Sequence, residues 1–274
     1  MKKILKRTGF LALLTLLAVG LAGCGGGNKD SAEDGNTLVK VSVTSVPHAE
    51  IFEHIQPELE KEGVKVELTV ADDYDVHNRS LAENEVDANF FQHFPYLEEQ
   101  IEDFGYEIQE FGKIHIEPLG VYSKKFASLD DLPEGATISI PNDPTNEARA
   151  LALLHRNGLI EMEDLDNLKA TIINIKENPK NFKFQEVDAA MLSRTLEDVD
   201  ASVINTNFAL AADLDPAGDA LVLEDADSPY VNILTIRNGD ENREELITIK
   251  EALMSDSVRK FIEDKYEGAI VPVF

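Results

Sequence analysis

The stretch EPLGVYSKK, residues 117–125, is the first place where the chain could change lobes, because regions that each resemble a complete α/β unit lie on both sides of it. A second stretch, DADSPYV at 225–231, leads into one further expected strand and two terminal helices. Two crossings of this kind fit a protein of two lobes whose C-terminal segment returns to the first lobe. A single large α/β domain fits the same pattern about equally well, so the pattern alone leaves both architectures open.

Short β-rich runs alternate with amphipathic stretches from residue 38 onward, which is typical of α/β layers around largely parallel sheets. We expect strands at about 38–44, 64–70, 87–91, 106–111, 114–122, 136–140, 171–175, 182–187, 201–204, 220–223 and 231–236. We expect helices at about 49–62, 78–84, 94–104, 145–157, 191–197, 206–212, 243–254 and 256–266.

The N-terminus has the layout of an export signal, with four basic residues among the first seven and an apolar run at 9–22. This run is too short to span a hydrocarbon core, which needs about 20 apolar residues. The segment Leu21–Cys24 resembles the signal of bacterial lipoproteins. We therefore expect residues 1–23 to be a signal peptide, Cys24 to carry the lipid, and residues 24–36 to form a polar tether.

The composition argues against several classes of function. The formal charge is −27 and becomes −31 without the signal peptide, so nucleic acid is an unfavourable partner. Cys24 is the only cysteine, which removes disulfides and thiolate sites from the folded part. Neither a nucleophile elbow nor a Gly-rich phosphate loop is present, and a calcium-like run at 213–224 is interrupted by Pro216. We expect no enzyme activity, no cofactor and no metal.

Polar and aromatic residues follow several of the expected strands. Such segments occur at 47–50, 91–96, 141–146 and 205–207. Ligands of open α/β sheets bind at the carboxyl ends of the strands. We therefore expect these four segments to converge on one cleft.

The third of these segments is suited to holding an anion. Asp143 is a good helix N-cap and Pro144 suits the first helical position. Asn146 and Arg149 are three residues apart and so lie on one helical face. Arg149 is the candidate for gripping a carboxylate through two hydrogen bonds. The alternative is a surface arginine paired with one of the 52 acidic residues.

Aromatic residues provide the apolar surface of the expected cleft. Phe90, Phe91, Phe94 and Tyr96 lie within seven residues, and Tyr74 precedes them. They could line a slot for an apolar side chain or belong to the ordinary core. Successive strand residues point in opposite directions, so one of Phe90 and Phe91 is expected in the core.

Six motifs in order resemble the NlpA/MetQ-type family of methionine-binding lipoproteins, which feed ABC importers. The motifs are DANFFQHFPYL (87–97), YSKK (122–125), PNDPTN (141–146), ENPKN (177–181), VINTN (203–207) and DSPYVN (227–232). The resemblance covers residue 38 to the C-terminus and includes the lipid signal. It implies a two-lobed, type II-like periplasmic-binding-protein fold with a ligand cleft between the lobes. Lobe one would be 37–120 plus 231–274, and lobe two 121–230.

The resemblance also implies roles for individual residues. Arg149, on the same helical face as Asn146, would hold the ligand carboxylate. Glu50 and Asn232 would receive the ammonium group, and Asn205 would fix the backbone atoms. Four side chains would enclose a thioether: Tyr74, Phe91, His93 and Tyr96.

The implied ligand is L-methionine or a related small amino acid, with a methionyl dipeptide or another small apolar amino acid as alternatives. A metal-binding lipoprotein is the more distant alternative. The implied partners are an ABC transporter permease and, through the lipid on Cys24, a membrane. The protein would be held at the extracytoplasmic face of the cell membrane.

Overall fold

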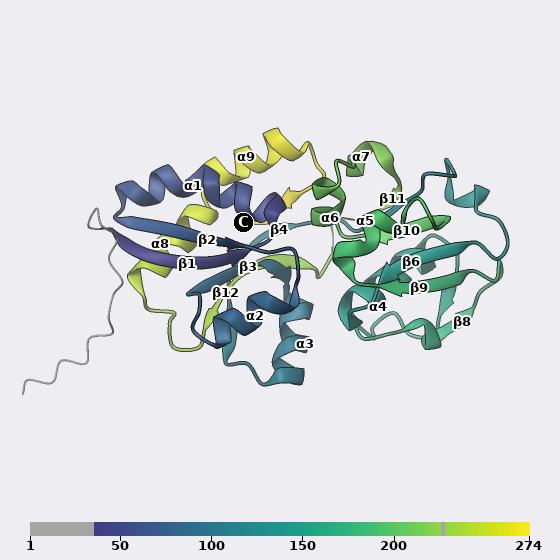
Figure 1. Cartoon of the computed structure of the whole chain (residues 1–274), viewed down its shortest axis with the longest axis horizontal. Coiled ribbons are helices and arrows are strands. Elements are labelled where there is room, and N and C mark those ends of the chain that lie inside the picture. The colour runs from purple at the N-terminus through teal and green to yellow at the C-terminus, as the bar shows by residue number, and fades with distance from the viewer. Residues whose placement is uncertain (1–35, 226–227) are drawn as a thin grey trace, which may run out of the picture.

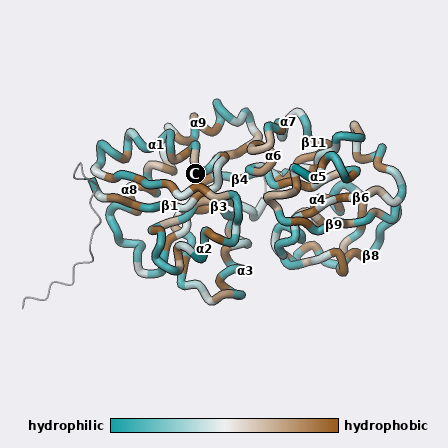
Figure 2. Tube along the Cα trace, in the orientation of Figure 1, coloured by the Kyte–Doolittle hydropathy of each residue, from teal (hydrophilic) through white to brown (hydrophobic). Residues whose placement is uncertain are grey.

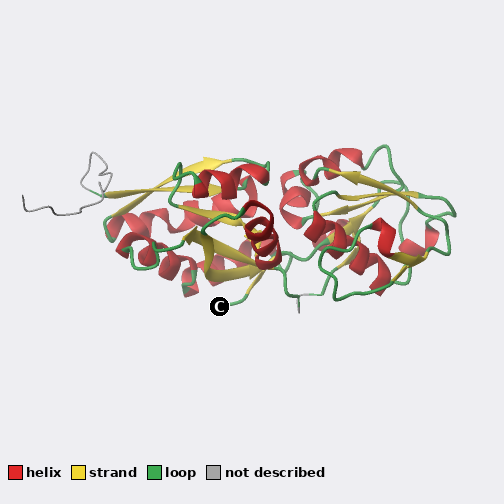
Figure 3. Cartoon of the chain, turned by 90° about the horizontal axis from the view of Figure 1, so that it is seen from below, coloured by secondary structure: helices red, strands yellow, loops and turns green. Residues whose placement is uncertain are grey.

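The computed structural model describes residues 36–225 and 228–274. The expected signal peptide, the lipidation site Cys24 and all of the expected tether except Asn36 lie outside the described residues. Among the described helices, we find none long and apolar enough to cross a membrane. The described chain forms two α/β lobes that lie side by side along the long axis of the molecule (Figures 1 and 3).

The first lobe is built on a six-stranded sheet. In order across the sheet, its strands are β13 (Val271–Pro272), β4 (Ile108–Ile116), β12 (Val231–Arg237), β3 (Ala88–His93), β1 (Thr37–Val43) and β2 (Val64–Val70). β1 is parallel to both β2 and β3, whereas β12 runs antiparallel to both β3 and β4. The C-terminal strand β12 therefore lies in the middle of the N-terminal lobe, as expected for a chain that returns to its first lobe.

Helices cover both faces of this sheet. α1 (Glu50–Lys61), α8 (Glu244–Leu253) and α9 (Asp256–Tyr266) lie on one face, and α2 (Asp75–Ala82) and α3 (Phe94–Phe104) on the other (Figure 1). The first face carries the larger core, in which Val39, Val41 and Val43 pack against α1 residues such as Phe52. Hydrophobic residues accordingly run along the inner strands, and hydrophilic residues predominate on the outer helices (Figure 2).

The second lobe has a five-stranded sheet and a small two-stranded one. The larger sheet has the order β11 (Ala220–Leu223), β5 (Gly120–Tyr122), β10 (Ala201–Ile204), β6 (Thr137–Pro141), β9 (Lys183–Val187). β7 (Glu161–Met162) pairs with β8 (Ile175–Glu177). The helices are α4 (Pro144–Arg156), α5 (Leu192–Thr195), α6 (Thr206–Ala211) and α7 (Pro216–Asp219).

Three of our expectations about secondary structure need correction. Both sheets are mixed rather than largely parallel, because the strands next to the crossings, β12 and β5, run antiparallel to their neighbours. The expected strand at 171–175 is a helical turn, Ile172–Asn174, that leads into β8. The two strands expected at 106–111 and 114–122 are instead the continuous β4 and the short β5.

The chain passes between the lobes at 117–119 and again between β11 and β12, a second crossing that includes Glu224 and Tyr230, and the two crossings are hydrogen bonded to each other. The N–H of Glu224 donates to the carbonyl oxygen of Leu119 over 2.8 Å. From the membership of the two sheets we propose that lobe one is 37–119 plus 231–274 and lobe two 120–230, one residue from the expected boundary of 120, because Gly120 is the first residue of β5 in the second sheet.

Of the two neighbouring phenylalanines, Phe90 is the core residue. It is fully buried against Phe52 and His48, at ring-centroid distances of 6.1 and 4.5 Å. We expect Phe90→Ala to lower the free energy of unfolding by about 3–5 kcal/mol, through lost burial and the cavity left behind. Chemical denaturation measures this change. Phe104→Ala is the control, since Phe104 is 61% exposed, and a similar loss in both variants would contradict the assignment.

Candidate binding site between the lobes

A narrow pocket lies between the lobes and is lined by both. It contains ≈ 340 Å³ of space outside the protein atoms, part of it open to solvent. The first lobe and the first crossing contribute Tyr74, Phe91, Gln92, His93, Tyr96, Glu117 and Asn232. The second lobe contributes Asn146, Arg149, Asn205, Thr206 and Asn207. Eight of the nine ligand-binding residues expected from the sequence are among them, and Glu50 is not.

Strand direction explains why these segments meet. β3 and β10 present their carboxyl ends to the pocket, where ligands of α/β sheets bind. β12 runs antiparallel to β3, so its beginning lies at the same edge, with Asn232 opposite His93. The helix α4 starts at the pocket with Asp143 as its N-cap, accepting the N–H of Asn146 over 3.0 Å. Three of the four expected segments therefore reach the pocket.

One side of the pocket is aromatic. The ring centroids of Tyr74 and Phe91 are 5.6 Å apart, and Tyr96 lies 5.9 Å from each of them. Phe208 extends the group from the second lobe, 5.1 Å from Tyr74. These edge and tilted arrangements leave ring faces and edges available to an apolar or sulfur-containing group. The structure thus brings together the three rings expected to enclose a side chain.

Neutral hydrogen bonds join the lobes across the pocket. The hydroxyl of Tyr74 donates to Oδ1 of Asn207 over 2.8 Å. Nε2 of His93 lies 3.2 Å from Oδ1 of Asn146, which also accepts from Nδ2 of Asn205 over 2.8 Å. The described conformation therefore has the lobes in direct contact around the site.

His93 is a neutral donor in this arrangement. Its Nδ1 accepts the N–H of Tyr96 over 3.1 Å, so Nε2 carries the proton that Asn146 receives. Burial, helped by the positive charge of Arg149, lowers the pKa of His93 to about 3. The imidazole therefore stays uncharged at neutral pH.

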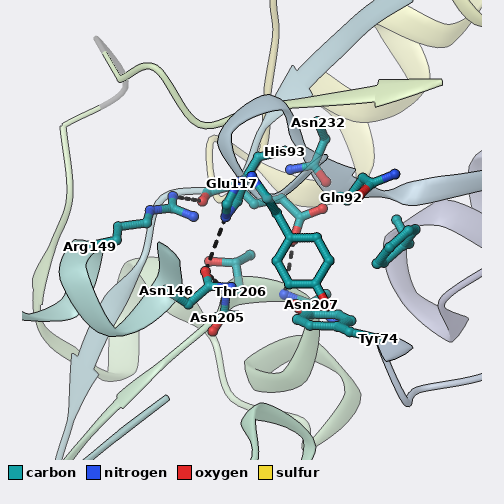
Figure 4. A pocket seen from close by; sticks show the side chains of 12 residues that line it. Tyr74, Gln92, His93, Glu117, Asn146, Arg149, Asn205, Thr206, Asn207 and Asn232 are labelled. Atoms are coloured by element: carbon teal, nitrogen blue, oxygen red, sulfur yellow. Dashed lines mark hydrogen bonds between the residues drawn. The ribbon is translucent and has the colours of Figure 1, made fainter. Parts of the chain in front are cut away.

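Arg149 is almost fully buried on the side of the pocket away from Tyr74 (Figure 4). Its Nε donates to Oε2 of Glu224 over 3.0 Å, and Nη2 donates both to the same oxygen, over 2.5 Å, and to the carbonyl oxygen of Glu117, over 2.7 Å. The pair of guanidinium hydrogen bonds that we expected for a ligand carboxylate is thus made to the carboxylate of Glu224. Nη1 has no hydrogen-bond partner among the described residues, and Arg149 lines the pocket.

Glu117 is a buried carboxylate at the centre of the site, in the first crossing (Figure 4). Its Oε1 accepts from Nε2 of His115 over 2.7 Å, and its Oε2 accepts the N–H of Asn207 over 3.1 Å. Burial raises the pKa of Glu117, while the charge of Arg149 and the N–H of Asn207 act in the opposite direction. Both oxygens already accept hydrogen bonds, as expected of the ionised form.

Glu50 lies outside the pocket, which corrects its expected role. It begins α1 and its Oε2 is 3.0 Å from Nζ of Lys265, and it also accepts the hydroxyl of Tyr266. Residues two apart in a helical segment face different directions. His48 therefore faces the site, where its Nε2 is 3.2 Å from Oδ1 of Asn232, while Glu50 faces α9.

Two asparagines, Asn205 and Asn232, also line the pocket. Oδ1 of Asn205 is buried and has no hydrogen-bond partner among the described residues. Asn232 is buried at the start of β12 and lines the pocket. Together with Glu117 they provide acceptors for a group rich in N–H donors.

His48, His115 and Glu117 have the donor types of a transition-metal site, with one ligand atom from each residue within 4.8 Å of the others. Hydrogen bonds already use two of these nitrogens: Nε2 of His115 bonds to Glu117, and Nε2 of His48 bonds to Asn232 outside the group. Oγ1 of Thr44 lies 2.6 Å from Nδ1 of His48 and orients that ring. This network holds the carboxylate of Glu117 in place.

Sequence reasoning missed Gln92, Glu117, Thr206 and Asn207 as pocket residues. Three of them stood in motifs already noted: Gln92 in DANFFQHFPYL, Thr206 and Asn207 in VINTN. Glu117 opens the crossing stretch, and a carboxylate between two apolar segments was the signal that could have identified it.

Comparison with known proteins identifies close relatives. Residues 39–274 match the sequence profile described as NlpA lipoprotein. The methionine-binding lipoprotein MetQ of Bacillus subtilis strain 168 is 40% identical over 96% of this chain and 97% of its own length. The D-methionine-binding lipoprotein MetQ of Escherichia coli K12 is 38% identical over 95% and 94%. A nutrient-binding protein from Burkholderia cenocepacia, solved bound to methionine, is 44% identical with a TM-score of 0.84, covering 86% of this chain and all of the other.

The histidine cluster makes stability depend on pH. Burial lowers the pKa of His115 to about 3, below the unfolded value of about 6.5. Between these values only the unfolded chain binds the proton, so this residue's contribution to stability is lost as the pH falls below 6.5. The free energy of unfolding rises with pH in this range, and we expect His115→Gln to reduce that slope by about 1.4 kcal/mol per pH unit between pH 6 and 4. Denaturant titrations across this range would contradict this if the two slopes were parallel.

Proposed function

The chain belongs to the NlpA lipoprotein family, and from this premise we propose that it captures methionine between its lobes and delivers it to an ABC importer. The single observation that carries the proposal is the order of chemistry across one pocket. A guanidinium lies on one side, a buried carboxylate at the centre and aromatic rings on the other side. This order matches the carboxylate, the ammonium group and the thioether tail of methionine.

In the proposed complex, each group of the ligand meets a complementary partner. Nη1 of Arg149 receives the carboxylate, and Glu117, Asn205 and Asn232 receive the ammonium group. The rings of Tyr74, Phe91 and Tyr96 enclose the thioether, with His93 beside them. Glu117 takes the place that the sequence suggested for Glu50, because Glu117 lines the pocket.

The magnitudes are sufficient for useful affinity. Burying roughly 100 Å² of apolar side chain contributes about 2.5 kcal/mol, and sulfur–aromatic contact adds about 0.3–1.5 kcal/mol. Charge-assisted hydrogen bonds at the two ends contribute about 1.5–3 kcal/mol each. Association costs at least about 4 kcal/mol, so the ligand must engage both lobes to bind tightly. Lobe closure then follows from the contacts that only the closed state provides.

Location and partner follow from the family together with the N-terminus. We infer that lipid on Cys24 holds the protein at the extracytoplasmic face of the cell membrane. There a permease would receive the ligand from the closed lobes. The basic start, the short apolar run and the single cysteine at the expected cleavage point support this inference. The proposed role is that of a binding protein, without catalysis.

Ligand identity can be tested by thermal unfolding of the lipid-free protein. Ligand at 100 times its dissociation constant stabilises the folded state by about 2.7 kcal/mol. At this chain length, each kcal/mol raises the melting temperature by about 2–4 °C. We expect L-methionine to raise the melting temperature by that amount and zinc or calcium to leave it unchanged. D-methionine, methionyl dipeptides and small apolar amino acids are measured alongside, because some relatives are named for the D-isomer. The protein is refolded from denaturant first to remove ligand from the host. No shift with any of the methionine forms would overturn the proposal.

The ammonium assignment predicts the effect of Glu117→Gln, which keeps size but removes the charge. Loss of a charge-assisted hydrogen bond of about 1.5–3 kcal/mol should weaken methionine binding about 10- to 100-fold by calorimetry. The matched ligand control is 4-(methylthio)butanoate, which lacks the ammonium group. We expect its affinity not to decrease in the variant. An equal loss for both ligands would show that Glu117 acts only on the structure.

A further inference from the structure

Both crossing segments converge on Arg149. From the first crossing, the carbonyl oxygen of Glu117 accepts Nη2 over 2.7 Å. From the second crossing, Glu224 accepts Nε over 3.0 Å and Nη2 over 2.5 Å, and the ring of Tyr230 lies 4.4 Å from the guanidinium carbon. All three side chains are at least nine-tenths buried, at 3, 6 and 5% exposure for Arg149, Glu224 and Tyr230.

These contacts use the guanidinium selectively. Nε and Nη2 carry three of its five N–H groups, and each of these two nitrogens donates to a crossing segment. The two N–H groups of Nη1 are left without partners among the described residues. A planar fork held along one edge by a carboxylate and on one face by a ring has little rotational freedom left. The remaining nitrogen is therefore fixed in direction before a ligand arrives.

We propose that Glu224 and Tyr230 are positioning residues, which aim Nη1 of Arg149 into the pocket and tie it to the two crossing segments. This inference rests on the proposed function, since it concerns how the same site recognises a carboxylate. Glu224 is itself tied to the first crossing, because its N–H donates to the carbonyl oxygen of Leu119 over 2.8 Å. A shift of either crossing would therefore move the arginine that meets the ligand.

Two opposing effects of Glu224 are possible, and they predict opposite results. If Glu224 positions Arg149, its loss lets the guanidinium turn and weakens binding of a ligand carboxylate. If Glu224 instead competes for Arg149, its loss strengthens that binding. The geometry favours positioning, because Glu224 occupies the edge of the fork opposite Nη1.

The experiment compares two ligands in wild-type protein and in Glu224→Gln, which keeps the side-chain size. Methionine and methioninamide differ at the carboxyl end, where a neutral amide with one acceptor oxygen and an NH2 donor replaces the carboxylate. We expect the dissociation constant for methionine to rise about tenfold in the variant, as for the loss of one charge-assisted hydrogen bond. The constant for methioninamide should change less than about twofold, because a neutral amide depends little on the guanidinium charge. Calorimetry or competition binding measures both constants.

Tyr230→Leu provides a second variant in case Glu224→Gln does not fold, and the same selective loss is expected from it. Asp87→Asn is the matched control, because it removes the carboxylate that Nη1 of Arg243 contacts at 2.8 Å in the first lobe, remote from the pocket lining. It should lower stability without changing the ratio of the two constants. An equal rise in both constants, or tighter methionine binding, in either positioning variant would overturn the inference. Failure of wild-type protein to bind methionine would instead overturn the proposed function.

Discussion

The binding site depends on keeping one positive charge buried. Removing a guanidinium from water is strongly unfavourable unless hydrogen bonds and opposite charge replace the lost solvation. Arg149 obtains both from the two segments that pass between the lobes, through Glu224 and the backbone of Glu117. The chain can therefore present a cation inside a narrow pocket only because both crossings lie beside it. Topology and electrostatics are linked here, because a chain that crossed only once would supply either the Glu117 carbonyl or the Glu224 carboxylate to Arg149, but not both.

That dependence explains why β12 must return to the first lobe. Antiparallel pairing with β3 places the beginning of β12 at the pocket edge and aligns Asn232 with His93. The same return path carries Glu224 and Tyr230 past Arg149. The antiparallel strand β12 thus brings Asn232 and the second crossing to this site. A wholly parallel sheet would bring only the carboxyl ends of its strands to the ligand.

The sequence predicted most of the elements but not their direction. Periodicity located β1, β2, α3 and α9 to within about two residues, because each has a clear apolar face. It could not show that β12 and β5 run antiparallel, since strand direction leaves no mark on local hydrophobic patterning. The segment 171–175 was mistaken for a strand because its β-branched residues outweighed the capping signal of Thr171. Whether the chain formed one domain or two stayed open for the same reason, as only long-range pairing distinguishes them.

Glu50 and Glu117 show the corresponding limit for the site. Both carboxylates follow a histidine by two residues, and local sequence gives no reason to prefer one. The choice is made by backbone conformation. At Glu50 the chain has entered a helix, where residues two apart point in different directions. At Glu117 it is leaving β4, where residues two apart share a face, so His115 and Glu117 point the same way and hydrogen bond.

Two of the contacts that join the lobes at the pocket are neutral, whereas Arg149 and Glu117, which we propose meet the ends of the ligand, are charged. Tyr74 to Asn207 and His93 to Asn146 are hydrogen bonds between uncharged partners, each contributing about 0.5–1.5 kcal/mol net. His93 can take this role because burial holds its pKa at about 3. Each of these two hydrogen bonds on its own favours closure only weakly. A zwitterion adds charge-assisted hydrogen bonds that neither lobe can make alone. The closed state is therefore more stable when the ligand is bound.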